Sequence, residues 1–289
     1  MTENIAGLSP GQQQLLNTWL PGAEVVTDHS WGLVGTTVLE LRHGTEHYIL
    51  KAGDGNDHHL AREIRAHHRW LRPWTSIGRA PELLGADRRA KLVVTRYLPG
   101  RLVEGTEDEH RPQTYRQAGR LLARLHGQES IDDPGFEARE QEKALLWLDQ
   151  PHRIAPGVLA RLRRTVQSWP TPPSRLVPTH GDWHPRNWLI HEGTVSAIDF
   201  GRADLRPAFT DLARLCAQQF RANPPLEAAF LDGYGADPRQ QEAWHRNRIR
   251  EAIGTAVWAY RVGADQFEQQ GHRMIAEALA DDPHRHGPR

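Results

Sequence analysis

The chain has 289 residues, which is enough for one large domain or two smaller ones. Its 36 basic residues balance its 36 acidic residues, and this neutral charge argues against a nucleic-acid-binding protein. A hydrophobic content of 38% and a charged content of 25% describe a globular protein rather than a disordered one. Apolar runs such as 144–148 are too short to cross a membrane.

The first third of the chain alternates short strand-like runs with turns. Ser9-Pro10 is typical of a helix start and predicts a helix over 11–20. A second helix is predicted over 57–71, where apolar residues recur on one face before Pro73. Five strands are predicted at 24–31, 36–42, 46–51, 82–87 and 91–98. These elements predict a small antiparallel sheet with one main helix.

Beyond Pro99-Gly100 the pattern is mostly helical, apart from a strand–loop–strand region over 175–200. The predicted helices are 113–126, 137–148, 157–169, 210–220, 239–262 and 265–281. We therefore expect an α+β protein of two lobes. The N-lobe would be a five-stranded sheet domain over 1–99, and the C-lobe a larger, mostly helical domain over 100–289. A cleft between the lobes is the expected place for a ligand.

The densest group of polar residues is the run HGDWHPRN at 180–187, followed by IDFG at 198–201. Asp182 and Asn187 are five residues apart, and Asp199 comes 12 residues later, which is the spacing of a phosphoryl-transfer site. In that chemistry Asp182 accepts the proton of an attacking hydroxyl. Asn187 and Asp199 supply the hard oxygen ligands that magnesium prefers.

The phosphates in such a site need a cationic partner, and Lys51 at the end of a predicted strand is the candidate. The chain has three lysines among its 36 basic residues, so a lysine within a strand is informative. Glu63, 12 residues later in the predicted helix, would orient Lys51 through an ion pair. The turn containing Gly32 and Gly35 would let backbone N–H groups approach phosphates.

The order of these motifs resembles the aminoglycoside phosphotransferase/choline kinase-like family over roughly residues 28–215. The resemblance implies a protein-kinase-like fold and Mg²⁺-dependent use of ATP or GTP to phosphorylate a small-molecule hydroxyl. It assigns Lys51 to the α/β-phosphates and Asp211 to a structural role. It also implies a hinge, near 95–99, whose backbone pairs with adenine. The hinge residues are Thr95, Arg96, Tyr97 and Leu98.

Two positions depart from the family pattern, because Trp183 and Trp188 stand where smaller aliphatic residues are common. Together with His184 they are candidates for lining a substrate pocket, and core packing is the alternative. We expect His180 to hold the catalytic loop by hydrogen bonds. Another interpretation is a hydrolytic metal site built from His180, Asp182 and His184, which would leave Lys51 and Asn187 without roles.

These residues predict an enzyme, a small-molecule kinase. The leading acceptor is an antibiotic, which phosphorylation would inactivate. Aminoglycosides come first, followed by macrolides and tuberactinomycin-type peptides such as capreomycin or viomycin. A metabolic kinase for choline or a sugar is the alternative, and a non-catalytic nucleotide-binding regulatory protein is an alternative of another class. The single Cys216 excludes an intrachain disulfide, and no signal-peptide pattern follows Met1, so we expect a cytoplasmic protein. Monomer and homodimer stay open.

Overall fold

The computed structural model describes residues 5–30 and 35–281. The chain forms two compact units, each assembled from separate stretches of sequence. The first unit comprises residues 1–128, 178–204 and 223–235, and the second comprises 129–177, 205–222 and 236–289. The predicted sheet and the predicted catalytic loop thus belong to the same unit. The proposed lobe boundary at residue 99 stays a prediction.

The first unit contains the predicted five-stranded antiparallel sheet, with strand order β1-β2-β3-β5-β4. Two strands are shorter than expected, because β1 ends at Asp28 and β5 at Arg96. The strands are β1 (Glu24–Asp28), β2 (Thr36–His43), β3 (Glu46–Gly53), β4 (Leu83–Asp87) and β5 (Leu92–Arg96).

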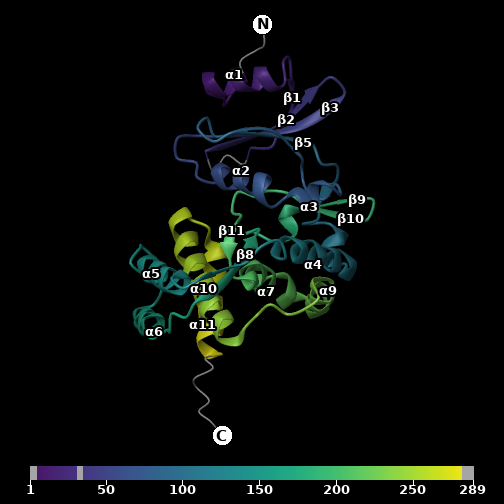
Figure 1. Ribbon diagram of the computed structural model, residues 1–289. Helices are drawn as coiled ribbons and strands as arrows, with labels where there is room; N and C mark the ends of the chain where they lie inside the picture. Colours follow the sequence, from purple (N-terminus) through teal and green to yellow (C-terminus); the bar gives the residue numbers. More distant parts are fainter. Residues whose placement is uncertain (1–4, 31–34, 282–289) are drawn as a thin grey trace. The chain divides into compact units, whose positions relative to one another are not determined.

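The two faces of this sheet carry different helices, and Figure 1 shows the sheet between them. Helix α1 (Pro10–Trp19) shares a hydrophobic core with Leu50 and Ala52 on one face. Helix α2 (Leu60–Arg69) packs against Val93 on the other. Because side chains alternate along a strand, Lys51, which pairs with Val93, is directed to the α2 face.

Side-chain hydrogen bonds are found at the starts of both helices. Ser9 and Gln12 form a reciprocal capping box at the start of α1. Helix α2 begins at Leu60 and not at the predicted residue 57, and the Leu60 amide donates to the Asp57 carboxylate at 2.9 Å. The same carboxylate accepts from Thr36 Oγ1 at 2.8 Å, which fixes the helix start to strand β2.

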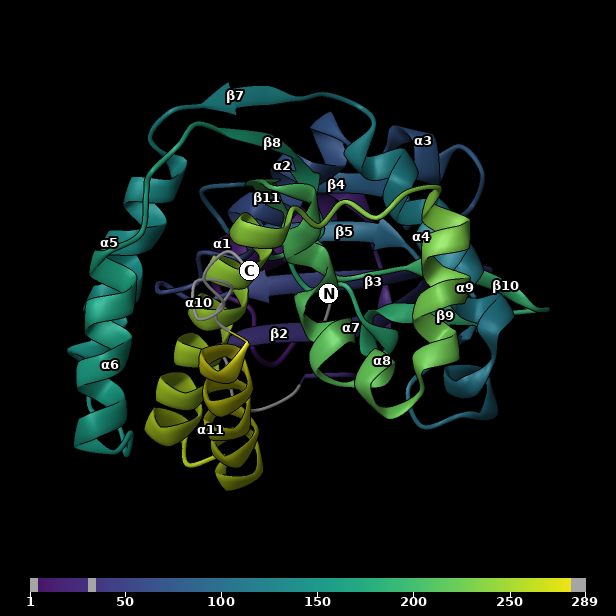
Figure 2. The same cartoon turned by 90° about the horizontal axis from the view of Figure 1, so that it is seen from below.

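The remainder of the first unit surrounds the helix pair α4 and α9, which lie side by side (Figure 2). Glycines make this contact close: a Cβ on Gly119 would lie 2.2 Å from the Phe230 carbonyl oxygen, and one on Gly233 would lie 2.0 Å from that of Arg116. The other elements of this unit are α3 (Arg72–Thr75), β6 (Arg101–Leu102), η1 (Glu107–His110), α4 (Pro112–His126), η2 (Pro185–Asn187), β9 (Trp188–His191), β10 (Thr194–Ala197) and α9 (Pro224–Tyr234).

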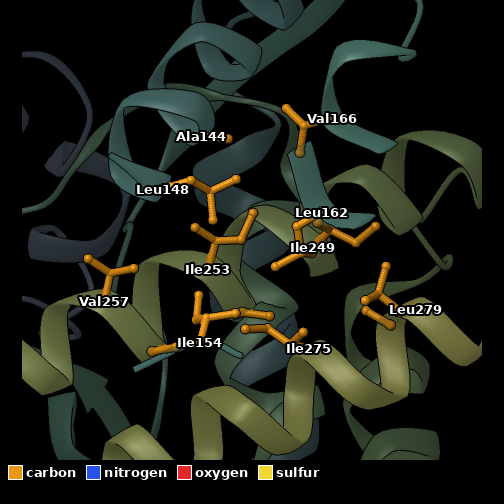
Figure 3. Packing of buried hydrophobic residues seen from close by; sticks show 13 residues of the cluster. Ala144, Leu148, Ile154, Leu162, Val166, Ile249, Ile253, Val257, Ile275 and Leu279 are labelled. Atoms are coloured by element: carbon orange, nitrogen blue, oxygen red, sulfur yellow. The ribbon is translucent and has the colours of Figure 1, made fainter. Parts of the chain in front are cut away.

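The second unit is built around four helices that share one hydrophobic core (Figure 3). Glu137 on α5 is buried with the guanidinium groups of Arg246 and Arg250 on α10, at 2.8 and 2.9 Å, so this core also encloses an ion cluster. The elements are β7 (Ile131–Asp133), α5 (Phe136–Leu148), α6 (Pro156–Gln167), η3 (Ala208–Leu212), α7 (Ala213–Ala217), α8 (Gln219–Ala222), α10 (Gln241–Val262) and α11 (Asp265–Ala280). Strands β8 (Ser174–Thr179) and β11 (Asp204–Arg206) span points where the chain passes between units.

Two expectations about helices were wrong. The predicted helix over 210–220 is broken into η3, α7 and α8, with non-helical backbone at Gln218. Helix α9 was not predicted, although Pro224 at its first turn and the apolar pair Leu226 and Phe230 are helix signals. No helix among the described residues has the length and apolar character needed to span a membrane.

Candidate active site

Lys51 and Glu63 form the predicted ion pair. Lys51 Nζ donates to both carboxylate oxygens of Glu63, at 2.8 and 3.0 Å. Strand alternation directs Lys51 toward α2, and Glu63 comes from the buried face of that helix. The bidentate pair therefore holds the lysine in one position, as an ammonium group that binds phosphates requires.

Asp199 brings a second carboxylate to Lys51, with Oδ1 3.5 Å from Nζ. Burial opposes the positive charge of Lys51, but the carboxylates of Glu63 and Asp199 outweigh it and raise the lysine pKa. In turn, the Lys51 cation lowers the pKa of Asp199, whose side chain stays about half exposed at 51%. An ionised, accessible carboxylate next to a fixed cation results.

The backbone at Asp199 is left-handed, with φ of +64°. Aspartate tolerates this region better than most residues, but the conformation requires support from its surroundings. The Gly201 amide donates to Asp199 Oδ1 at 3.4 Å, and the next side chain, Phe200, is fully buried. The carboxylate orientation is thus fixed by the buried segment that follows it.

Asp182 and Asn187 meet in the loop between β8 and β9, as their spacing predicted. The Asn187 amide nitrogen donates to the Asp182 backbone oxygen at 2.8 Å and to its carboxylate Oδ2 at 3.1 Å. Both side chains are buried. This arrangement orients the Asp182 carboxylate and uses the nitrogen end of the Asn187 amide, which leaves its oxygen as the candidate cation ligand.

His180 holds this loop, as expected. It is fully buried, and its Nε2 donates to the Ile198 carbonyl oxygen at 3.0 Å. Its ring also contacts the ring of Phe200, with centroids 5.0 Å apart. The histidine therefore ties the segment before Asp182 to the segment that carries Asp199.

The predicted pocket residues are part of the core instead. Trp183 and Trp188 are 1% and 0% exposed, and their ring centroids are 5.3 Å apart. Trp74 and Tyr115 extend the aromatic cluster at 5.6 and 5.4 Å. His184 is also buried, with Nε2 3.6 Å from Asp182 Oδ1. The two tryptophans therefore pack in the core, and His184 is buried beside Asp182 in the predicted catalytic loop.

The structure describes some of the nucleotide-binding residues predicted from the sequence. Gly32 lies outside the described residues. At Gly35 a Cβ would overlap the Asp54 carboxylate at 2.0 Å, and the approach of this turn to phosphates stays a prediction. In the hinge segment the Tyr97 amide donates to the His47 carbonyl oxygen at 2.9 Å. The Arg96 amide likewise donates to the Glu82 carbonyl oxygen at 2.8 Å, and Thr95 is buried, so adenine pairing by this segment stays a prediction.

The alternative hydrolytic metal site is not formed. Among residues 5–30 and 35–281, no three His, Cys, Asp or Glu side chains are grouped so that they could hold a metal ion. His180 Nε2 is engaged by a backbone carbonyl, so that nitrogen is not available as a ligand. The pair Asn187 and Asp199 offers oxygen ligands, which suit Mg²⁺ rather than zinc. Asp211 is buried in η3, and its structural role stays a prediction.

Sequence reasoning missed two residues, His59 and Arg65, that connect α2 and its N-cap to the Asp199 segment. His59 Nδ1 donates to the Gly201 carbonyl oxygen at 3.0 Å. Arg65 donates to the Ala203 carbonyl oxygen at 3.1 Å and to Asp204 Oδ1 at 2.8 Å. The sequence contained no signal for these contacts, because they join residues that are more than 130 positions apart and depend on the docking of α2.

The chain is similar to known proteins in sequence pattern and in fold. Residues 32–248 match the model of the phosphotransferase enzyme family. The choline kinase LicA from Streptococcus pneumoniae aligns with a TM-score of 0.66 at 15% identity, over 93% of this chain and 97% of that one. A thermostable mutant of the aminoglycoside phosphotransferase APH(4)-Ia, in a ternary complex with AMP-PNP and hygromycin B, aligns with a TM-score of 0.68 at 12% identity, over 95% and 99%.

A third solved structure, a macrolide 2′-phosphotransferase type I, aligns with a TM-score of 0.58 at 17% identity, over 94% of this chain and 99% of that one. No curated protein matches the sequence significantly. At these identities the structural likeness shows the fold, which is protein-kinase-like. Because the family model also spans most of the sequence, the chain belongs to the phosphotransferase enzyme family.

Proposed function

We propose that this protein transfers the γ-phosphoryl group of ATP or GTP to a hydroxyl group of a small molecule. The observation that carries the proposal is the convergence in one unit of two pairs: Lys51 with Glu63 beside Asp199, and Asp182 with Asn187. Phosphoryl transfer requires a fixed cation for the phosphates, oxygen ligands for a metal and a base for the hydroxyl. These residues are suited to all three tasks.

In the proposed reaction the acceptor oxygen forms a bond to the γ-phosphorus while the bond from that phosphorus to the β–γ bridging oxygen breaks. Asp182 accepts the hydroxyl proton, and the Asn187 amide keeps its carboxylate in position. Lys51 binds phosphate oxygens, oriented by Glu63. Asn187 and Asp199 would hold Mg²⁺, which neutralises phosphate charge when bound.

The acceptor proposed first is an antibiotic, with aminoglycosides ahead of macrolides and tuberactinomycin-type peptides. The similarity in fold to solved aminoglycoside and macrolide phosphotransferases supports this order. A metabolic acceptor is the second candidate, because a choline kinase has a comparable TM-score. The convergence of Lys51, Asp182 and Asp199 argues against a non-catalytic nucleotide-binding protein. A cytoplasmic location, where ATP and Mg²⁺ are plentiful, belongs to the proposal.

The test is a mass-spectrometric screen of the purified protein with ATP or GTP and Mg²⁺. The acceptor panel contains aminoglycosides, macrolides, tuberactinomycin-type peptides, choline and simple sugars. A phosphate adduct on one antibiotic supports the leading proposal, and adducts confined to choline or a sugar favour the metabolic kinase. Failure to bind Mg²⁺ and nucleotide, together with no adduct, overturns phosphotransferase activity.

A further inference from the structure

Helix α2 and the residue before it are hydrogen-bonded to the segment that follows Asp199. Two side chains make the connection, His59 to the Gly201 carbonyl oxygen at 3.0 Å and Arg65 to the Ala203 carbonyl oxygen at 3.1 Å. Arg65 also forms an ion pair with Asp204 at 2.8 Å. We call His59 and Arg65, with these contacts, the α2 latch.

Close packing accompanies these hydrogen bonds. A Cβ on Gly201 would lie 3.1 Å from His59 Cβ and 3.4 Å from Asp199 Oδ1, so glycine is what allows the helix to approach. Two turns farther along α2, the edge of His67 meets the Phe200 ring with centroids 5.8 Å apart. Since His59, Glu63 and His67 are spaced four residues apart, one stripe of α2 contacts both Lys51 and the Asp199 segment.

These contacts close a ring of interactions. The ring runs from His59 through α2 to Glu63, then to Lys51, to Asp199 and back through Gly201 to His59. If the latch opens, Glu63 and Asp199 lose their fixed separation, although neither side chain has changed. The left-handed backbone at Asp199 also loses part of the support that keeps it in that conformation.

We propose that His59 and Arg65 are positioning residues that hold the Lys51–Glu63 pair and the Asp199 carboxylate in the arrangement that binds metal–nucleotide. The proposal rests on the proposed function. Neither residue touches the reacting atoms. Their effect on the site is geometric, and displacements of about 1 Å at a catalytic centre are costly.

This role predicts a specific kind of defect. His59 is partly exposed and Arg65 is exposed, so losing the His59 hydrogen bond or the Arg65 hydrogen bond and ion pair should change global stability little. The defect should appear in the binding of nucleotide with Mg²⁺, because Asp199 is the group displaced. Nucleotide binding without the metal should change much less, because it does not depend on the Asp199 carboxylate.

The experiment measures AMP-PNP binding by calorimetry, with and without Mg²⁺, together with thermal unfolding. His59→Leu removes the donor, whereas His59→Asn keeps a nitrogen near the position of Nδ1. Arg65→Gln weakens the second contact. His68→Ala, on the exposed side of the same helix, and Arg88→Gln, in an exposed turn, are matched controls. Gly201→Ala tests the close approach independently.

We expect His59→Leu and Arg65→Gln each to weaken Mg²⁺-dependent binding by about fivefold to tenfold, the effect of losing one hydrogen bond. His59→Asn should restore most of that affinity, Gly201→Ala should reduce it, and the controls should match the wild type. Binding without Mg²⁺ and the melting temperature should stay close to wild-type values.

The proposal is overturned if His59→Leu and Arg65→Gln bind Mg²⁺ and AMP-PNP as tightly as the wild type. It is also overturned if both lose affinity equally with and without the metal while the melting temperature falls, since the contacts would then be structural only. If the wild-type protein binds no nucleotide, both the proposed function and the proposed role of the latch are refuted. If the wild type binds nucleotide and the variants bind it equally well, only the proposed role of the latch is refuted.

Discussion

At the scale of single residues, the carboxylates of Asp182 and Asp199 in the candidate site differ in their exposure and in their hydrogen-bond partners. Asp199 is exposed and ionised beside Lys51, in a left-handed backbone conformation. Asp182 is buried and oriented by the Asn187 amide. Accessibility suits a metal ligand, and a fixed orientation suits a base that must meet one hydroxyl. The two carboxylates therefore have environments that match different tasks.

Replacing Asp182 tests the role of the base. Asp182→Asn keeps the size of the side chain and a partner for the Asn187 amide, but an amide does not accept the hydroxyl proton. We expect turnover with the acceptor identified by the screen to fall by about 10²–10⁴-fold. AMP-PNP affinity should stay near the wild-type value. Asp132→Asn, an exposed residue in β7, is the control, and an Asp182→Asn enzyme of full activity would refute the assignment.

His67 makes a prediction about acid stability. Burial lowers its pKa from 6.5 to about 3, with smaller contributions from the cations of Lys51 and His68. The folded protein therefore keeps His67 neutral while the unfolded chain binds a proton below pH 6.5. The stability contributed by neutral His67 is full above pH 6.5 and is lost as the pH falls toward 3.

Substituting this histidine should flatten the pH dependence. When the pH falls from 7 to 5, the free energy of unfolding should decrease by up to about 2 kcal/mol less in His67→Leu than in the wild type. Urea unfolding at several pH values measures the difference. Parallel curves for the two proteins would mean that His67 takes up a proton equally in the folded and unfolded states.

At the scale of elements, the contact between α4 and α9 depends on glycine. A Cβ on Gly119 would meet the Phe230 carbonyl oxygen at 2.2 Å, and backbone cannot move aside as a flexible side chain can. We expect Gly119→Ala to lower the free energy of unfolding by about 3 kcal/mol. Gly11→Ala in α1, where no atom lies within 4 Å, should instead raise it by about 0.5 kcal/mol. Denaturant unfolding measures both, and equal effects would contradict the packing argument.

Local sequence signals predicted the sheet and most helices well, because they depend on neighbouring residues. The alternation of side chains along β3 directs Lys51 toward α2, and the ion pair with Glu63, 12 residues later, was predicted from that spacing. The signals failed where the outcome depends on distant packing. Nothing near Trp183 or Trp188 in the sequence reveals that Trp74 and Tyr115 will enclose them.

At the scale of the whole molecule, ligand binding should stabilise the fold, because the candidate site includes residues of β3, α2 and the predicted catalytic loop. At a concentration 100 times its dissociation constant, AMP-PNP with Mg²⁺ should add about 2.7 kcal/mol to the free energy of unfolding. Lys51→Met should lose most of this gain, because the phosphates lose their cation. Thermal unfolding with and without ligand measures it, and an undiminished shift in Lys51→Met would show that Lys51 does not contact the phosphates.

The first unit is discontinuous, with residues 129–177 of the chain belonging to the second unit. During synthesis on the ribosome, Lys51 and Glu63 emerge well before Asp182 and Asp199. A nascent chain therefore contains Lys51 and Glu63 before it contains the proposed metal ligands Asn187 and Asp199. The proposed nucleotide binding would favour the folded state only once residues 178–204 have left the exit tunnel, so ATP would act on the late stages of folding and not on the early ones.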